Sequence, residues 1–490
     1  MADAGAKVDF DVVIIGAGIS GINQAYWMQK KMPELSYTVL EARDNMGGTW
    51  DLFKYPGIRS DSDLYTYGFS WAPWNVRGAI AEGSAITKYL KESSEAYGIS
   101  SKIRYRHRVK STDWSSASQT WEVSVDADGK PEKIVCHFIV WCTGYYDYEK
   151  PLDVFIPGIE SFKGPVIHPQ FWPEDLDYEN KQVVIIGSGA TAVTLLPNVA
   201  KKAAHVTMLQ RSPSYVMSQP SEDGIEWFIR TVFPSFITSR LIRMKWLFIP
   251  WLIVSIARIS PNTIRNLITK EAIAQLPPTM KIDPHFNPKY NPFEQRVCFC
   301  PDGDFYKALR EGKASVATGI IDTVTPNSIK LKSGQELTPD IIVTATGLRL
   351  QLGGGVPITV DNEPYLTAGK FFWKFALCQD LPNAAFVIGY VDAAWTLAAD
   401  TTAYMLCRLW KQMRREDAGV VVPRAEPGLE KKELPFLNLT STYVTKAKDV
   451  LPRAADAKNW QPRTYYLLDM WRARFGDLKT GAQYIKGSVW

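Results

Sequence analysis

The chain has 490 residues, 46% of them hydrophobic and 22% charged, which is enough for two or three domains with substantial cores. Its net charge of +5 is small, and basic and acidic residues are interspersed, so we expect no nucleic-acid partner and favour a small molecule. The six cysteines form neither a CxxC pair nor a metal-ligand spacing, which predicts reduced thiols, a cytoplasmic protein and no metal.

The N-terminal region has no secretion signal and begins with a predicted strand, turn and helix. The segment DVVIIGAGISG places a β-branched strand over residues 12–15, followed by a GxGxxG turn and a helix to about Met32. Gly16 allows the sharp bend, Gly18 lets a pyrophosphate approach the backbone, and Gly21 allows close packing of helix on strand. The spacing predicts a dinucleotide site.

A second predicted strand, over residues 37–40, ends in an acid. The carboxylate of Glu41 can accept hydrogen bonds from a ribose 2′-OH. The ligand of this first site is therefore predicted to have a free ribose, as FAD and NAD do. The loop that follows, residues 46–61, reads MGGTWDLFKYPGIRSD and carries the polar and aromatic side chains typical of a functional loop.

The same unit returns at KQVVIIGSGATAVTLL, where Gly187, Gly189 and Ala192 form a GxGxxA turn. The next strand, over residues 205–209, is followed by Arg211 instead of an acid. A guanidinium pairs with a 2′-phosphate that a carboxylate would repel, so the second site is predicted to bind NADPH. A solvated surface arginine is the alternative interpretation of Arg211.

The run WLFIPWLIVSIA, residues 246–257, is unbroken in its apolar character, flanked by basic residues and too short to span a bilayer. We favour a buried helix or the wall of a substrate pocket. The alternative is an interfacial helix, which would add peripheral membrane association to the cytoplasmic localisation.

Two apolar segments, IVWCTGYY and DIIVTATGLRLQL, end on small-residue turns and are predicted to connect the two nucleotide-binding units. Two such sites in one chain imply hydride transfer from a nicotinamide to a flavin. Since no cysteine pair has the spacing of a redox disulfide, reduction of a disulfide is not expected to follow.

The linker FKGPVIHPQFWP, residues 162–173, matches the FxGxxxHxxxWP fingerprint of the type I Baeyer-Villiger monooxygenases, and the loop at 46–61 matches their GGxWxxxxYPGxxxD pattern. The sequence resembles that family over nearly its whole length and is most similar to the ethionamide monooxygenase subgroup. The matched positions are Phe162, Gly164, His168, Trp172 and Pro173, with Gly47, Gly48, Trp50, Tyr55, Pro56, Gly57 and Asp61.

The resemblance implies specific roles. Arg296 would be the catalytic arginine, whose guanidinium never deprotonates and can stabilise the anions of oxygen transfer, and Asp61 would orient it. The linker at 162–173 would be a hinge, with Gly164 supplying backbone freedom and His168 near the nicotinamide; a purely structural hydrogen bond is the alternative for this histidine. Gln295 stands where many members have lysine, which predicts a weaker preference for NADPH.

The implied fold class is α/β, with two Rossmann-like dinucleotide-binding domains, for FAD and NADP, and a mainly helical insertion. Gly48, Trp50 and Asp61 are implied to join the FAD site. The expected segments are 1–150 and 345–490 for the FAD domain, 151–215 and 292–344 for the NADP domain, and 216–291 for the insertion.

The function this predicts is an FAD-dependent, NADPH-consuming monooxygenase that uses dioxygen to convert ketones to esters or lactones. Oxidation of sulfides or thioamides is expected as well. One alternative is a flavin monooxygenase restricted to nitrogen or sulfur atoms, and another is an NADPH-binding redox sensor without turnover.

Overall fold

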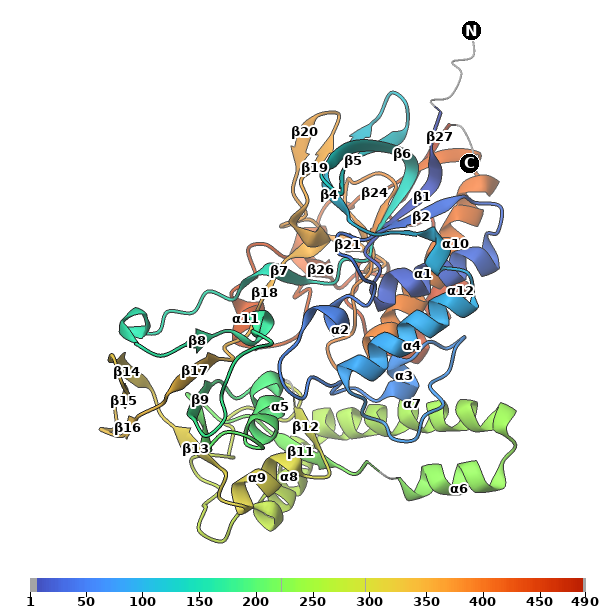
Figure 1. Cartoon of the computed structure of the whole chain (residues 1–490). Coiled ribbons are helices and arrows are strands. Elements are labelled where there is room, and N and C mark those ends of the chain that lie inside the picture. Colours follow the sequence, from blue (N-terminus) through green and yellow to red (C-terminus); the bar gives the residue numbers. More distant parts are fainter. Residues whose placement is uncertain (1–6, 222, 296, 488–490) are drawn as a thin grey trace.

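The structure is a computed structural model that describes residues 7–221, 223–295 and 297–487. Figure 1 shows a large sheet with helices on one side, a small sheet below it, and long helices that extend beneath the large sheet. The predicted α/β class, with two Rossmann-like units and a mainly helical insertion, is confirmed.

The large sheet has nine strands and runs in the order β20-β19-β4-β5-β6-β1-β2-β3, with β23 paired to β6. Its central strand β1 pairs in parallel with both β2 and β6. Both faces of β1 are buried, with Val12 and Ile14 in the core cluster of one face and Val13 and Ile15 in that of the other. A strand buried on both faces needs a continuous apolar run instead of an alternation, as the sequence has here. The bounds are β1 (Phe10–Ile15), β2 (Tyr37–Leu40), β3 (Ile103–Arg104), β4 (His107–Ser115), β5 (Thr120–Ala127), β6 (Lys130–Trp141), β19 (Ile358–Val360), β20 (Glu363–Tyr365) and β23 (Ala384–Phe386).

Helices from both ends of the chain cover one face of this sheet. Helix α1 (Ile19–Lys31) packs against α10 (Trp395–Arg415), which packs in turn against α12 (Tyr466–Phe475). The chain therefore returns to its first sheet after residue 345. The other elements near this sheet are α2 (Thr49–Leu52), α3 (Leu64–Tyr67), α4 (Gly83–Ala96), β21 (Phe372–Trp373), β22 (Leu377–Cys378), β24 (Ala418–Pro423), β25 (Glu433–Leu434), α11 (Thr442–Thr445), β26 (Ala454–Ala455) and β27 (Ala482–Lys486).

The small sheet has five strands, all paired in parallel, in the order β13-β10-β9-β17-β8. Helices α5 and α9 contribute to the core on one face, and the three-stranded β14-β15-β16 sheet covers the other. The bounds are β8 (Val166–Ile167), β9 (Gln182–Ile186), α5 (Ala190–Val199), β10 (His205–Gln210), α9 (Asp304–Arg310), β13 (Ala314–Thr318), β14 (Ile321–Val324), β15 (Ile329–Leu331), β16 (Glu336–Leu337) and β17 (Ile341–Thr344).

The two connections between the sheets run side by side. Strand β7 (Tyr146–Pro151), leaving the large sheet, pairs antiparallel with β18 (Leu348–Leu350), which returns to it. Figure 1 shows this ribbon between the two sheets. The two predicted connecting segments thus form one structural element.

The insertion leaves the small sheet through β11 (Val216–Gln219), which pairs in parallel with β12 (Cys298–Pro301). Between them lie α6 (Gly224–Val232), α7 (Ser235–Ile259) and α8 (Pro261–Gln275). Among the described residues no single helix has the length and apolar character of a membrane span, although the bent pair Phe236–Ile259 and Pro261–Gln275, at 116°, passes that test together.

Candidate functional site

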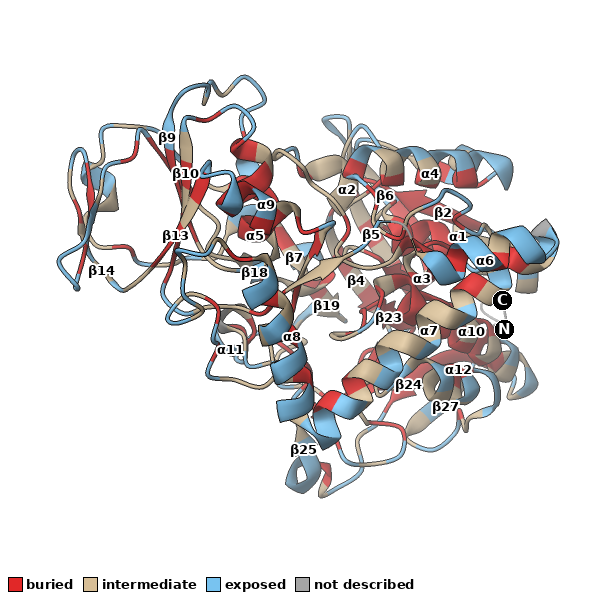
Figure 2. Ribbon diagram, turned by 90° about the horizontal axis from the view of Figure 1, so that it is seen from below, coloured by how far each residue is buried: buried red, intermediate tan, exposed pale blue. Residues whose placement is uncertain are grey.

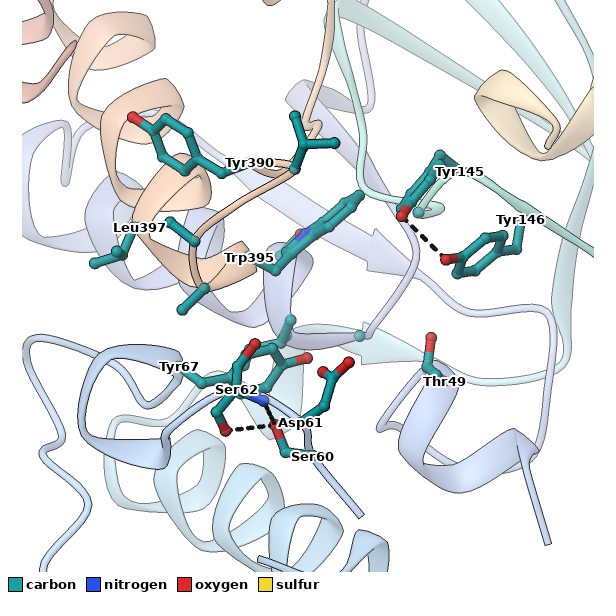
Figure 3. A pocket seen from close by; sticks show the side chains of 18 of the residues that line it. Thr49, Ser60, Asp61, Ser62, Tyr67, Tyr145, Tyr146, Tyr390, Trp395 and Leu397 are labelled. Carbon is teal, nitrogen blue, oxygen red and sulfur yellow. Dashed lines mark hydrogen bonds between the residues drawn. The ribbon is translucent and has the colours of Figure 1, made fainter. Parts of the chain in front are cut away.

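A cavity of about 1330 Å³ lies where the first glycine-rich turn, the loop at 46–61 and the insertion meet. It is called the cavity below. Of the predicted site residues, Gly16, Gly18, Glu41, Gly48, Trp50 and Asp61 line it. Figure 3 shows Asp61, Trp395 and Tyr145 around one part of this space.

The first glycine-rich turn forms a bare backbone cradle at the cavity wall. Gly16 has φ +104°, and a Cβ there would lie 2.6 Å from the carbonyl oxygen of Cys142. A Cβ on Gly21 would lie 1.9 Å from the carbonyl oxygen of Gly16, so this glycine permits the close packing of α1. Gly18 faces the Cα of Gly48 across an open gap, where a Cβ would approach no closer than 3.5 Å. This gap is where a pyrophosphate would approach the main chain.

Glu41 ends β2 as expected and is buried. Its carboxylate accepts hydrogen bonds from the backbone N–H groups of Ala17, at 2.9 Å, and Arg43, at 3.1 Å. The guanidinium of Arg43 donates to Asp51 at 2.9 Å and to the carbonyl of Gly48 at 2.8 Å. Arg43 thus holds the Gly-Gly loop against the end of β2. This residue was not predicted from the sequence, although its position two residues after the acid that ends the strand could have indicated it.

Trp50 and Asp61 reach the cavity from the same loop. The indole N–H of Trp50 donates to the hydroxyl of Tyr67 at 2.8 Å, and burial raises the pKa of that tyrosine. Next to Asp61, the hydroxyl of Ser60 donates to the carbonyl of Ser62 at 2.7 Å and accepts from its N–H at 3.1 Å. This turn holds the backbone on both sides of Asp61, whose carboxylate points into the cavity in Figure 3.

Arg296, the predicted catalytic residue, lies outside the described residues. Its neighbours Gln295 and Val297 both line the cavity. The position of the Arg296 side chain stays a prediction.

An aromatic wall of the cavity was not expected from the sequence. The rings of Trp395 and Tyr145 stack with centroids 5.0 Å apart and planes within 9°. The indole N–H of Trp395 donates to Ser20 at 2.7 Å, and the hydroxyls of Tyr145 and Tyr146 are 3.0 Å apart. These residues come from three distant parts of the chain, so no local pattern could have found them.

The second glycine-rich turn is built like the first but does not line the cavity. Gly187 has φ +141°, and its Cβ would lie 2.3 Å from the carbonyl oxygen of Ala345. Gly189 is open, with no atom within 4 Å of a Cβ position, and Ala192 is buried in α5. Arg211 follows β10 and is exposed, as either interpretation of this residue requires.

The linker at 162–173 is built into the small sheet, where residues 166–167 form its edge strand. His168 Nε2 lies 3.2 Å from the carbonyl oxygen of Gly347, and its Nδ1 accepts from the N–H of Gln170 at 3.3 Å. Burial lowers the pKa of His168, so its imidazole is neutral near pH 7. These contacts match the structural alternative for His168, which does not line the cavity.

Gly164 has a steric role that was not expected from the sequence. A Cβ at this position would lie 2.3 Å from the carbonyl oxygen of Asp340 and 2.7 Å from the ring of Phe162. The glycine is needed for this close approach, and the backbone freedom expected of it in a hinge stays a prediction.

The apolar run at 246–257 lies within α7. The interpretation favoured from the sequence, a buried helix or a pocket wall, holds for only one side of this helix. Trp246, Ile253 and Val254 line the cavity, as a pocket wall should. Leu252 and Ile256 are exposed on the outer side, so the expectation of a buried helix was wrong there. Figure 2 shows α7 with exposed and partly buried residues along its length.

Comparisons with known proteins agree on one kind of chemistry. A family model described as flavin-binding monooxygenase-like matches residues 77–254, and one for an NAD(P)-binding Rossmann-like domain matches residues 14–79. The chain is 44% identical to the FAD-containing monooxygenase EthA of Mycobacterium tuberculosis over 96% of each protein, and 42% identical to EthA of Mycolicibacterium smegmatis over 95% of each.

Solved structures share the fold. Oxidised steroid monooxygenase bound to NADP superposes with a TM-score of 0.75 and 18% identity over 98% of this chain and 100% of that one. OTEMO in complex with FAD and NADP gives a TM-score of 0.72 and 19% identity over 97% of this chain and 100% of that one.

We expect a substitution in each glycine-rich turn to abolish the binding of one cofactor. Gly18→Val should fold but lose flavin absorbance, because Gly18 has ordinary extended backbone angles and its side chain would fill the pyrophosphate gap. Gly189→Val should keep the flavin and lose NADPH binding, so each variant controls for the other. Flavin content and NADPH titration are the measurements, and full flavin in Gly18→Val would contradict the first site.

Arg211 is expected to set the nicotinamide preference. Arg211→Ala should lower the ratio of kcat/KM for NADPH to that for NADH by about 10- to 100-fold, the loss of a charge-assisted contact of about 1.5 to 3 kcal/mol. The exposed Arg415, at the end of α10, provides a control as Arg415→Ala. Equal efficiency with both cofactors in the parent enzyme would refute this role.

Proposed function

Because this chain belongs to the FAD-containing monooxygenases of the type I Baeyer-Villiger group, we propose that it inserts one oxygen atom of dioxygen into ketones, giving esters or lactones. The resemblance seen in the sequence is thereby confirmed at the level of the family. The protein is a flavin-dependent monooxygenase that uses FAD and NADP and acts on a small molecule. A redox sensor without turnover does not fit a chain of this family.

The described residues fit both cofactors. The open gap between Gly18 and Gly48, with buried Glu41 beside it, suits the pyrophosphate and ribose of FAD, and Trp50 would contact it further along the cavity. The gap at Gly189 and the exposed Arg211 suit NADPH. Bound FAD would supply the chemistry that takes electrons from NADPH and activates dioxygen.

One observation carries the ketone proposal: the carboxylate of Asp61 and the two chain neighbours of Arg296 line the same cavity. We propose that Asp61 orients the guanidinium of Arg296 there. A ketone gains negative charge on its carbonyl oxygen when it is attacked, and a fixed guanidinium stabilises that charge. Arginine suits this role because its guanidinium stays protonated throughout the reaction.

The cavity wall formed by α7 indicates which kind of substrate fits. Its Trp246, Phe248, Trp251 and Val254 offer apolar and aromatic surface, and its one charged residue at the cavity, Arg258, is paired with Asp392. Such a wall binds an uncharged organic molecule by removing apolar surface from water. Apolar ketones are therefore the proposed substrates, with sulfides and thioamides as further ones.

The remaining alternative is a monooxygenase restricted to nitrogen or sulfur. Incubation with NADPH and a panel of ketones and sulfides, followed by mass spectrometry, separates the two. Esters or lactones support the proposal, whereas sulfoxides without any ester favour the alternative.

Arg296→Ala should retain reduction of the flavin by NADPH and lose ketone oxygenation by about two to three orders of magnitude, the cost of removing one oriented stabiliser of a developing oxyanion. Asp61→Ala should show a milder defect of the same kind, because the guanidinium remains but is less well oriented. Stopped-flow reduction and ester yield per NADPH are the measurements, with Arg415→Ala as control. Ester formation at the parent rate in Arg296→Ala would overturn the assignment.

A second proposal concerns the outer face of α6, a helix whose charged side chains face the protein. Glu226 is 4% exposed and accepts hydrogen bonds from Tyr65, at 2.5 Å, and Arg230, at 2.8 Å. Trp227 and Phe228 are 61% and 55% exposed. The exposed apolar face, called the α6 face, consists of Ile225, Trp227, Phe228, Val232, Phe233 and Phe236.

We propose that the α6 face rests on the surface of an anionic phospholipid bilayer. Helix α7, which follows, has four basic residues, of which Arg243, Lys245 and Arg258 are paired with acids of the protein, so the charge that faces outward comes from Arg240. Arg240 on that helix is exposed, as is Arg77, which lies near α6 because Tyr65 bonds both Glu226 and the carbonyl of Val76. Aromatic side chains with exposed cations beside them are the usual means of interfacial binding.

More of the protein should cosediment with vesicles rich in phosphatidylglycerol than with phosphatidylcholine vesicles. Burial of the apolar side chains contributes to binding of both, and attraction between the exposed cations and the anionic lipid adds to binding of the first. Trp227→Glu with Phe228→Glu should abolish this, while Phe155→Glu, at a residue 86% exposed elsewhere, should not. Equal sedimentation of all three proteins, or self-association through the α6 face in place of vesicle binding, would contradict the proposal.

A further inference from the structure

The loop segment Tyr55–Arg59 makes contacts with both halves of the molecule. Its backbone is held on the side of the large sheet, where Ser60 N–H donates to the carbonyl of Ala81 at 3.0 Å and Gly83 N–H donates to that of Ile58 at 2.9 Å. Residue Arg59 also forms an isolated β-bridge with Glu82. The segment is therefore a fixed part of the large-sheet half, next to the start of α4.

The side chains of the same segment reach the other half. Tyr55 packs against the core of the small sheet. Gly57 has φ +76°, and a Cβ there would lie 1.9 Å from the side-chain nitrogen of Asn198, near the end of α5. No side chain fits between this turn and α5 without displacing Asn198.

The strongest of these contacts is an ion pair. The guanidinium nitrogens of Arg59 lie 2.5 and 3.3 Å from the two carboxylate oxygens of Asp304, the first residue of α9. The side chains are 10% and 30% exposed, so the pair is largely shielded from water. A two-pronged guanidinium–carboxylate pair fixes both distance and orientation. Neither residue lines the cavity.

We propose that Arg59 and Asp304 hold the small-sheet half, and with it the NADPH site, at a fixed position relative to the flavin cavity. The hydride that leaves the reduced nicotinamide, forming NADP⁺, must reach the flavin across this boundary. Such a transfer needs the reacting atoms within about 3 to 3.5 Å. Arg59 is thus a positioning residue, and Asp61, two residues further on, lies in the cavity. The inference rests on the family's use of FAD and NADP and not on the ketone proposal.

The first test measures geometry. Because the cysteines are buried, spin labels should attach selectively to Lys88→Cys on α4 and Lys332→Cys beside β15, both exposed positions. Pulsed electron resonance on the labelled protein should give one narrow distance distribution. Arg59→Gln should broaden or shift it, and Arg59→Glu combined with Asp304→Arg should restore it.

The second test measures hydride transfer without any organic substrate. At saturating NADPH, flavin reduction in Arg59→Gln should slow by about 10- to 100-fold, the cost of misplacing reactants by about 1 Å. Flavin content and reduction by dithionite should not change. Arg59→Lys keeps the charge but loses the two-pronged geometry, so it should show an intermediate rate even if Arg59→Gln proves unstable.

The control is Arg104→Gln, which removes an ion pair within the large sheet, in which one guanidinium nitrogen of Arg104 donates to both carboxylate oxygens of Glu132, at 2.9 and 2.8 Å. It should alter neither the distances nor the rate. The proposal is overturned if Arg59→Gln keeps both parent values, or if the charge-reversed pair folds but restores neither. Because ester formation is not measured, failure of the ketone proposal would leave these results unaffected.

Discussion

Both glycine-rich cradles depend on the same contact, a backbone carbonyl packed where a glycine has no side chain. Gly16 meets the carbonyl of Cys142, and Gly187 meets that of Ala345, with Cβ positions only 2.6 and 2.3 Å from the oxygens. Each carbonyl belongs to a segment that connects the sheets. Any larger residue would push the turn away from the connection, so the contact that opens space for a pyrophosphate also attaches each cradle to the β7-β18 ribbon.

Two further contacts complete this frame. The guanidinium of Arg243, on α7, donates to the carbonyls of Tyr65 and Gly68 at 2.7 and 3.0 Å, which holds the insertion against the large-sheet half. The pair of Arg59 with Asp304 holds the small sheet from the other side. Buried arginines suit this purpose because one planar group satisfies several acceptors at once. The cavity lies between these anchored parts.

Two features of the sequence depend on residues that are distant in the chain. Gly164 must be a glycine because the carbonyl of Asp340 and the ring of Phe162 leave no room for a Cβ. The apolar run of α7 was expected to be a buried helix or a pocket wall, and it lines the cavity on one side while Leu252 and Ile256 are exposed on the other. The carbonyl of Asp340 and the other walls of the cavity come from distant parts of the chain, and the local pattern carries no information about them.

The sequence by itself determined the strands, turns and helices of both nucleotide-binding units, because glycine spacing and apolar runs act over a few residues. It also identified Glu41, Gly48, Trp50 and Asp61, which the fold brings to one cavity. Only the tertiary structure decided that Trp395 stacks on Tyr145, that Arg43 secures the Gly-Gly loop, and that Arg59 meets Asp304. Such pairs join residues as much as 250 positions apart, and their energies arise from burial and geometry that exist only after the chain has folded.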